Sequence, residues 1–214
     1  MSRIDDLARA TRSGIVAVIR AESDELLVEV ARALAAGGVD VLEVTFTVPR
    51  AEKVLERVAA ALGDEVLLGA GTVLDPETAR TALLAGARFV VSPTLNFEVI
   101  RLCHRYDRLV FPGAFTPTEV LAAWEAGADA VKVFPVDAVG PGYLKALRGP
   151  LPQVRLLPTG GIDLTNAAAY LKAGACALGV GGSLVDPQAV REGNFARLTE
   201  LAKEFTAIAR AAKN

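Results

Sequence analysis

The chain has 214 residues, of which 52% are hydrophobic and 22% are charged, and its net charge is −2. No Pro/Ser-rich linker or charge block divides the chain, and its apolar content argues against disorder. The charge balance and the 6% aromatic content argue against a nucleic-acid surface. No stretch reaches the roughly 20 apolar residues that a membrane span needs. We therefore predict a single domain over residues 1–214 with neither a nucleic-acid nor a membrane partner.

The N-terminal segment and the cysteines indicate the compartment. The segment Met1-Ser2-Arg3-Ile4-Asp5-Asp6 lacks the apolar core of a signal peptide, which predicts a cytoplasmic protein. Cys103 and Cys176 have neither a motif spacing nor a partner cluster. They therefore predict neither a disulfide nor a thiolate metal site.

Short β-branched runs alternate with alanine-rich helical stretches along the chain. Most of the runs are continuously apolar, as expected of strands that are covered on both faces. The expected strands are 15–20, 41–47, 66–71, 89–93, 109–113, 130–135, 154–159 and 177–181. The expected helices are 4–12, 24–36, 51–62, 76–85, 97–106, 117–126, 142–147, 165–173 and 192–212.

The ends of these helices carry their own signals. An N-cap residue stands before a proline at Asp75-Pro76, Thr116-Pro117 and Asp186-Pro187. C-cap glycines are expected in the pairs Ala36-Gly37, Ala85-Gly86, Ala126-Gly127 and Ala173-Gly174. Eight successive βα units predict an α/β fold, a (β/α)₈ TIM barrel with an extra N-terminal helix. The rival is a doubly wound open sheet, but no GxGxxG follows the first strand.

Lys132 lies inside the apolar run Ala130-Val131-Lys132-Val133-Phe134-Pro135, whereas the other lysines lie in helical or terminal stretches. Burial penalises the charged form of a lysine and lowers its pKa, which leaves a neutral amine able to attack a carbonyl. The alternative is a lysine at a strand end that reaches solvent or pairs with a carboxylate.

Chemistry in a barrel belongs at the C-terminal ends of the strands, and three further polar residues fall there. Glu43 lies in the apolar segment Val41-Leu42-Glu43-Val44. It is either half of a structural ion pair or a general acid/base beside the amine. Arg20 either caps the barrel or binds a substrate carboxylate with its planar fork. Thr72 either supplies a hydroxyl to the site or merely ends a strand.

A glycine-containing pair follows each of the last two expected strands, where barrels often bind phosphate with backbone N–H groups. Gly160-Gly161 and Gly182-Ser183 occupy these positions. One such pair is often only a tight turn, but two at these positions favour a phosphate cradle. His104, the only histidine, falls in a helical stretch. A Ser-His-Asp triad or a histidine-based metal site is therefore not expected, and acidic strand-end clusters for Mg²⁺ are missing.

Taken together and in chain order, these residues resemble the class I 2-keto-3-deoxy-6-phosphogluconate (KDPG)/4-hydroxy-2-oxoglutarate (KHG) aldolases. The matching segments are Leu42-Glu43-Val44-Thr45, Gly69-Ala70-Gly71-Thr72-Val73, Val91-Ser92-Pro93, Val131-Lys132-Val133-Phe134-Pro135, Pro158-Thr159-Gly160-Gly161-Ile162 and Gly181-Gly182-Ser183. The resemblance implies a (β/α)₈ barrel, a homotrimer, and reversible cleavage of KDPG to pyruvate and glyceraldehyde 3-phosphate. It also makes KHG a second candidate substrate and implies no metal and no organic cofactor.

The resemblance also implies a role for each site residue. Lys132 matches the Schiff-base lysine and Glu43 the residue that shuttles protons. The pyruvyl end would contact Thr72, Pro93 and Phe134. The phosphate of the 2-keto acid would contact Thr159, Gly160, Gly161, Gly182 and Ser183.

One position departs from part of the family. Some members carry arginine at the position of Thr47, so we expect Arg20 to bind the carboxylate here. Two other functions remain open on the same barrel. A phosphosugar isomerase or epimerase would have no need of Lys132. A non-catalytic phosphosugar-binding protein would be expected to have lost Lys132 or Glu43.

Overall fold

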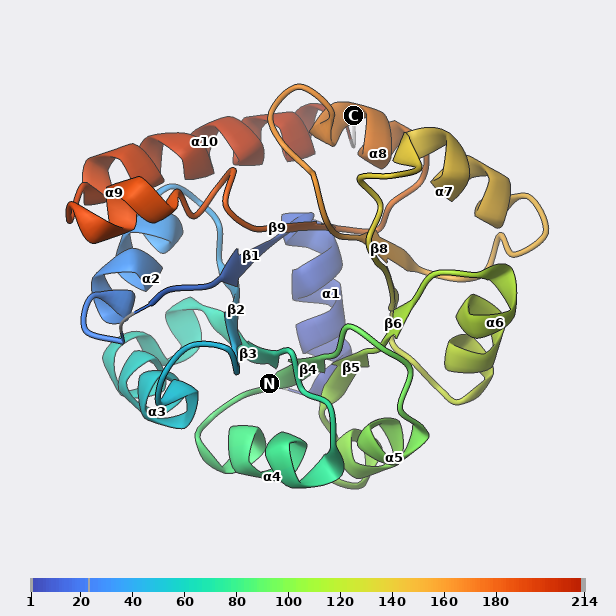
Figure 1. The fold of residues 1–214 in the computed structure, drawn as a ribbon, viewed down its shortest axis with the longest axis horizontal. Helices are drawn as coiled ribbons and strands as arrows, with labels where there is room; N and C mark the ends of the chain where they lie inside the picture. The colour runs from blue at the N-terminus through green and yellow to red at the C-terminus, as the bar shows by residue number, and fades with distance from the viewer. Residues whose placement is uncertain (1, 23, 213–214) are drawn as a thin grey trace.

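The computed structural model describes residues 2–22 and 24–212, and it shows parallel strands surrounded by helices (Figure 1). The strands are β1 (Ile15–Ile19), β2 (Val41–Thr45), β3 (Leu67–Gly71), β4 (Phe89–Val91), β5 (Leu109–Phe111), β6 (Gly113–Ala114), β7 (Val131–Val133), β8 (Leu156–Pro158) and β9 (Leu178–Val180). The helices are α1 (Arg3–Ser13), α2 (Leu27–Ala36), α3 (Ala51–Leu62), α4 (Pro76–Leu84), α5 (Phe97–Arg105), α6 (Pro117–Glu125), α7 (Gly140–Arg148), α8 (Ala167–Lys172), α9 (Pro187–Arg191) and α10 (Phe195–Ala211), with a 3₁₀ turn, η1 (Gly63–Glu65).

The strands form two curled parallel sheets. One has six strands in the order β5-β4-β3-β2-β1-β9, and the other has three in the order β6-β7-β8. The two sheets adjoin twice: only Pro112 separates β5 from β6, and a parallel bridge pairs Thr159 with Gly179. The strand predicted at 109–113 is therefore interrupted at Pro112, which has no N–H to donate to a neighbouring strand.

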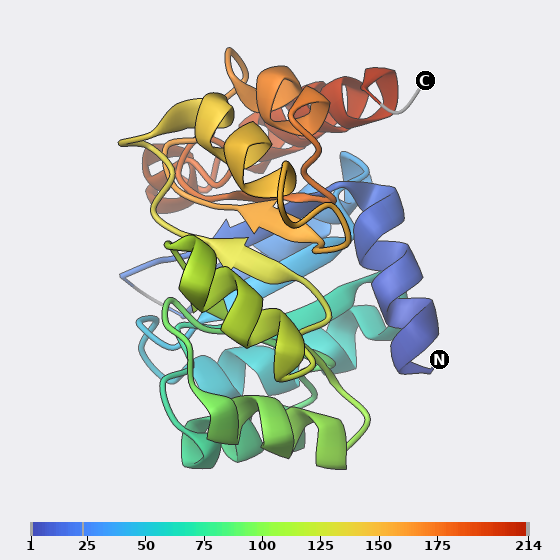
Figure 2. The ribbon, with the colours of Figure 1, turned by 90° about the vertical axis from the view of Figure 1, so that its right-hand side faces the viewer.

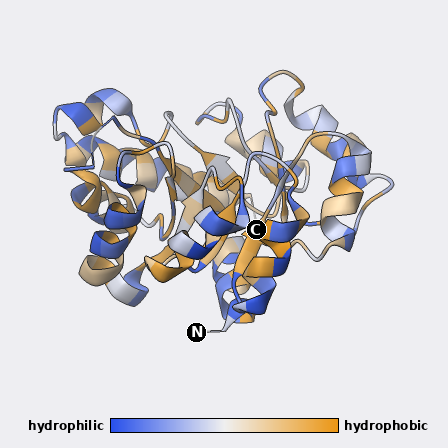
Figure 3. Cartoon of the chain, turned by 60° about the horizontal axis from the view of Figure 1, so that its bottom comes forward, coloured by the Kyte–Doolittle hydropathy of each residue, from blue (hydrophilic) through white to orange (hydrophobic). Residues whose placement is uncertain are grey.

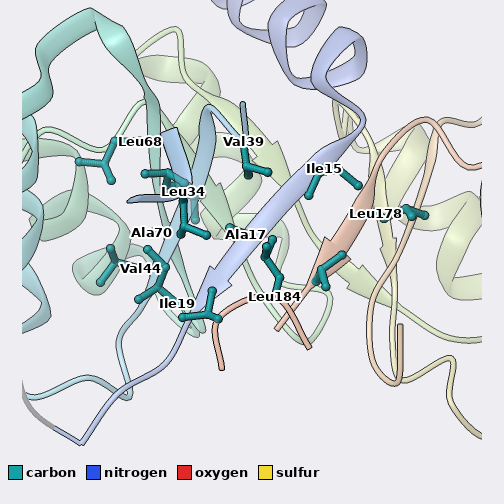
Figure 4. Packing of buried hydrophobic residues seen from close by; sticks show 14 of the residues in the cluster. Ile15, Ala17, Ile19, Leu34, Val39, Val44, Leu68, Ala70, Leu178 and Leu184 are labelled. Atoms are coloured by element: carbon teal, nitrogen blue, oxygen red, sulfur yellow. The ribbon is translucent and has the colours of Figure 1, made fainter. Parts of the chain in front are cut away.

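Two apolar layers hold the fold together. The larger one lies between strands and helices and includes Ile15, Ala17 and Ile19 of β1. Figure 4 shows these side chains along β1, with Ile15 near Leu178 of β9. Apolar residues gather towards the centre and hydrophilic residues lie on the outer sides of the helices (Figure 3). This distribution is typical of parallel strands that helices cover.

The second apolar layer fills the inside of the curled sheets. Its residues include Val16, Val41 and Ala130, and Leu7 and Ala10 of α1 pack against it. Helix α1 thus covers the N-terminal ends of the strands, as Figure 2 shows. Successive side chains of a strand point to opposite faces, so the next inward-facing position is two residues further along each strand. On β2 and β7 these positions are Glu43 and Lys132.

The helix boundaries confirm several of the sequence signals and correct others. Asp75, Thr116 and Asp186 are N-caps whose side chains accept backbone N–H bonds, as predicted. After α2, Gly38 has the left-handed φ (92°), one residue beyond the predicted Gly37. The predicted helix 24–36 begins only at Leu27.

The helix predicted over 192–212 is confirmed as the single helix α10, but it begins only at Phe195. Glu192 ends α9, and Gly193 has a φ of 65° that a helix does not allow. Asn194 then caps α10 by accepting from the N–H of Arg197. None of the helices in the described part of the chain is both long and apolar enough to cross a bilayer.

Candidate active site

Lys132 of β7 projects into the inside of the curled sheets, and only 2% of it is exposed. Its neighbours Val131 and Val133 belong to the outer apolar layer. Burial lowers the pKa of Lys132; the charge of Glu43 opposes this shift and the charge of Arg20 adds to it. Its Nζ lies 5.1 Å from the centre of the Phe134 ring. The side chain is therefore a buried amine whose neutral form is favoured.

Glu43 of β2 is the second buried ionisable group of this layer, and it is also 2% exposed. Burial raises its pKa, against the opposing charges of Lys132 and Arg20. Its Oε1 is buried and has no hydrogen-bond partner. No salt bridge joins it to Lys132 in the described residues. This geometry does not favour the structural ion pair, which needs direct hydrogen bonds to offset its desolvation.

The backbone of Gly71 makes room for the Glu43 carboxyl group. A Cβ at this position would lie 1.8 Å from Oε1 of Glu43. Gly71 pairs with Thr45 in the register of β2 and β3, two residues beyond the pair of Glu43 and Gly69. The sequence showed the glycine within a motif, but this contact depends on the pairing of two strands and was not predicted.

A cavity of about 300 Å³ opens at the C-terminal ends of β1, β7, β8 and β9. It brings together seven of the predicted site residues: Arg20, Phe134, Thr159, Gly160, Gly161, Gly182 and Ser183. Four residues that line it were not predicted as site residues: Val18, Ile162, Gly179 and Gly181. Val18 could have been predicted, because alternate residues of a strand point to the same face, and Val16, Val18 and Arg20 therefore share one face of β1.

The two glycine loops shape the wall of this cavity. Gly160 and Gly161 have φ angles of 104° and 64°, which favour glycine. A Cβ on Gly161 would come within 2.6 Å of the Cβ of Asp137. The backbone N–H groups of Gly182 and Ser183 donate to no acceptor in the described residues. These groups are exposed and available to an anion.

The Thr159 side chain is the third polar element of the cavity. Its Oγ1 is buried without a hydrogen-bond partner, although the residue is 7% exposed. Gly179 faces it: a Cβ at that position would lie 2.2 Å from this oxygen. An unpaired buried hydroxyl costs free energy, so this group is prepared for a ligand that hydrogen-bonds to it.

Arg20 is exposed at the end of β1, and its charge acts on both Lys132 and Glu43. It also lines a second cavity of about 510 Å³ together with Thr47. Thr72 directly follows β3 and is half-buried with a φ of 57°, a strained conformation for a β-branched residue. Pro93 follows β4 and is half-buried. Among the described residues that line the 300 Å³ cavity, four of the predicted site residues are absent: Glu43, Thr72, Pro93 and Lys132.

His104 lies away from this site, as its helical position predicted. Its Nε2 is 2.9 Å from a guanidinium nitrogen of Arg3, in the N-terminal helix α1. Arg3 also pairs with the buried Asp129. Within residues 2–22 and 24–212 no group of three or more His, Cys, Asp or Glu side chains is placed to hold a metal ion.

A buried amine and a buried carboxyl group, whose charges act on one another on the inner face of parallel strands, define a site for carbonyl chemistry. The sequence profile of the KDPG and KHG aldolase family matches residues 5–201. The chain therefore belongs to the KDPG and KHG aldolase family.

Individual relatives agree with this assignment. The 2-dehydro-3-deoxy-phosphogluconate aldolase of Treponema pallidum is 40% identical over 195 residues, which cover 90% of this chain and 92% of the relative. The 2-dehydro-3-deoxy-6-phosphogalactonate aldolase of Escherichia coli K12 is 38% identical over 176 residues, 81% of this chain and 85% of the relative. The structure of Legionella pneumophila KDPG aldolase, with pyruvate captured as a covalent carbinolamine, superimposes with a TM-score of 0.86. It is 34% identical and the match covers 92% of this chain and 96% of that one.

Proposed function

We propose that this chain is a Schiff-base aldolase that cleaves KDPG to pyruvate and glyceraldehyde 3-phosphate. The observation that carries the proposal is the buried Lys132 amine, whose pKa is lowered, beside Glu43. The amine attacks the C2 ketone to give a carbinolamine, and loss of water leaves an iminium ion. That cation accepts the electron pair of the breaking C3–C4 bond, so the reaction requires neither a metal nor an organic cofactor.

Glu43 is the proton carrier in this proposal. Its raised pKa keeps a protonated fraction that donates to the departing carbinolamine oxygen. The resulting carboxylate then accepts the C4 hydroxyl proton as the C3–C4 bond breaks. Glyceraldehyde 3-phosphate leaves, the enamine is protonated at C3, and hydrolysis of the iminium releases pyruvate and the free amine.

The two ends of the substrate are assigned to different residues. Arg20, Thr72, Pro93 and Phe134 would surround the pyruvyl group, with the Arg20 fork on the carboxylate. Two cradle loops, residues 159–161 and 182–183, would hold the phosphate; exposed backbone donors and the unpaired Thr159 hydroxyl support this. KHG, which has no phosphate, would contact only the residues assigned to the pyruvyl group.

We infer that the two sheets form one closed (β/α)₈ barrel and one domain. At the first junction Asp129 donates to the carbonyl of Val110 and Lys132 to that of Pro112, so β7 continues the pairing across β5 and β6. At the second junction Cys176 donates to Leu156, and Thr159 bridges to Gly179. Hydrogen bonds at both junctions support closure.

The homotrimer implied by the family resemblance is also a proposal. Leu74 is 52% exposed and Phe97 is 43% exposed. The two are near one another, because the Asn96 amide donates to the Leu74 carbonyl over 2.9 Å. Exposed apolar neighbours of this kind support a contact between subunits. Light scattering on the purified chain tests the assembly, and a monomer at working concentration would rule it out.

Borohydride trapping tests the activity. Incubation with pyruvate and borohydride should add one reduced pyruvyl group at Lys132 and inactivate the enzyme. The variant Lys132→Ala should form no adduct, whereas Lys203→Ala, on the exposed side of α10, should behave as the wild type. An isomerase or a phosphosugar-binding protein would form no adduct at all. Comparing kcat/KM for KDPG and KHG then identifies the preferred substrate.

A further inference from the structure

A groove on the outer surface, between α7 and α8, is positively charged and shares no lining residue with the 300 Å³ cavity. Its volume is about 650 Å³, and Lys145 and Arg148 of α7 line it together with Lys172 of α8. No carboxylate of residues 2–22 or 24–212 lines it. The two helices are neighbours in the fold, as Figure 1 shows. Three cations from two helices therefore face one open space.

None of these cations is paired with an acidic side chain in the described part of the chain. Lys145, Arg148 and Lys172 make no hydrogen bond or ion pair within the described residues. The Nε atom of Arg148 is buried and has no hydrogen-bond partner among the described residues. Leaving a buried donor of a charged group unpaired costs free energy. The groove thus carries unpaired charge, and its lining residue Arg148 keeps one donor without a partner.

The absence of a side chain at Gly174 makes room for the Arg148 guanidinium. Gly174 follows α8 with a φ of 99°, and a Cβ there would lie 1.7 Å from a guanidinium nitrogen of Arg148. The guanidinium therefore packs against bare backbone at the end of α8. The planar fork of the guanidinium suits two oxygens of a phosphate or carboxylate.

The helix dipoles oppose this charge but do not cancel it. Helices α7 and α8 end at Arg148 and Lys172, and each C-terminus carries a partial charge of about −0.5. Three cations less two such ends leave a local charge of about +2. The whole chain has a net charge of −2, which disfavours a long polyanion such as a nucleic acid.

We propose that this groove binds a small multivalent anion of the phosphate-ester class. Its volume lies within the roughly 300–1,000 Å³ that small-molecule sites occupy. Arg148 would contact two oxygens of the ligand, and Lys145 and Lys172 would act as point charges on either side. Binding at this groove does not depend on Lys132 or on the proposed aldolase activity.

Calorimetric titration of the full chain with inorganic pyrophosphate at low ionic strength tests the proposal. The wild type should bind one anion more per chain than Lys145→Gln/Lys172→Gln, or bind it at least roughly 10-fold more tightly. Lys53→Gln/Lys203→Gln removes the same charge from exposed positions elsewhere and should bind as the wild type. Aldolase activity should be unchanged in both double variants.

A second variant separates a shaped site from diffuse charge. Arg148→Lys keeps the charge and removes the fork, so it should also weaken binding, by several-fold. The proposal is overturned if the groove variant and the wild type bind the same number of anions with equal affinity. It is equally overturned if the matched control loses as much affinity as the groove variant, or if Arg148→Lys binds as the wild type.

Discussion

Lys132 and Glu43 are buried in the same layer without a direct hydrogen bond between them. Desolvation favours the neutral form of both groups: it lowers the pKa of Lys132 and raises the pKa of Glu43. At neutral pH each pKa shift lowers the free energy of unfolding, because the charged form of the group is more stable in the unfolded chain than in the folded one. The site therefore keeps two reactive groups ready at the expense of stability.

Removing both charges should stabilise the protein. The variant Lys132→Met/Glu43→Gln keeps the volumes similar and removes the buried charges, so we expect a gain of about 1–4 kcal/mol in the free energy of unfolding. Urea denaturation at neutral pH measures this gain, and activity should be lost. A double variant less stable than the wild type would show that the two groups stabilise one another in the fold.

Gly71 should be a positioning residue for Glu43. In Gly71→Ala the new Cβ displaces the Glu43 carboxyl group, since the two atoms would otherwise be 1.8 Å apart. A displacement of about 1 Å at a catalytic group costs roughly 10²-fold in rate, so kcat should fall by that amount. The loss should stay within the roughly 10²–10⁴-fold expected for Glu43→Gln.

The pH profile distinguishes positioning from a general loss of structure. A displaced Glu43 has a new environment, so the pH dependence of kcat/KM in Gly71→Ala should shift, while borohydride trapping at Lys132 persists. Gly142→Ala is the control, because a Cβ there meets nothing within 4 Å. Unchanged kinetics in Gly71→Ala would mean that Glu43 relaxes without consequence.

At the scale of elements, features that depend on neighbouring residues were predicted better than features that depend on strand pairing. The N-caps at Asp75, Thr116 and Asp186 are confirmed, because a cap depends on neighbouring residues only. The break at Pro112 and the helix end at Glu192 were missed, although Pro112 and Gly193 both gave a local signal. The packing of Glu43 on Gly71 could not be read from the sequence, since it depends on strand register.

The N-terminal helix α1 was predicted as an addition, but its contacts make it part of the core. Asp6 is 1% exposed and pairs with Arg88, whose side chain is 16% exposed. Arg9 pairs with Asp40 over 2.8 Å and donates to backbone carbonyls of η1. Buried ion pairs thus anchor α1 across the N-terminal ends of the strands.

Asp6→Ala should therefore destabilise the fold. Removing one partner leaves Arg88 as an unbalanced, mostly buried charge, which costs about 3–5 kcal/mol. The exposed Asp64 also pairs with Arg88, so the lower end is expected. Glu98→Ala removes half of an exposed pair with Arg101 and should cost under about 1 kcal/mol. Equal denaturation midpoints for the two variants would contradict the anchoring of α1.

At the scale of the whole molecule, different groups control stability in different pH ranges. The pKa values of Asp24, Asp75 and Asp163 are lowered, chiefly by hydrogen bonds from Arg50, Thr78 and Thr165 respectively. Their contribution is present above the unfolded value of 3.8 and is lost as the pH falls through the folded values below it. Glu43 acts in the opposite sense, because its folded pKa is raised. Its cost to stability develops as the pH rises above 4.5.

His104 should control stability in a higher range of pH. Its pKa is lowered from 6.5 chiefly by burial and then by the charge of Arg3, against the charge of Asp129 and a backbone hydrogen bond with Gly127. Arg3 can only donate, so the Nε2 of His104 must accept, and the ring must be neutral. Just below pH 6.5 the His104 imidazole of the unfolded chain is protonated, whereas that of the folded chain stays neutral. Stability is therefore lost as the pH falls from 6.5 towards the folded pKa.

The variant His104→Gln isolates this effect. Its amide oxygen can still accept from Arg3, but the side chain does not titrate. We expect the difference in Tm between wild type and variant to change as the pH falls below 6.5, with the wild type losing more stability. Glu43 and the aspartates titrate in both proteins, so their contributions cancel in the difference. A difference in Tm that stays constant from neutral pH to pH 5 would show that protonation of His104 does not affect the docking of α1.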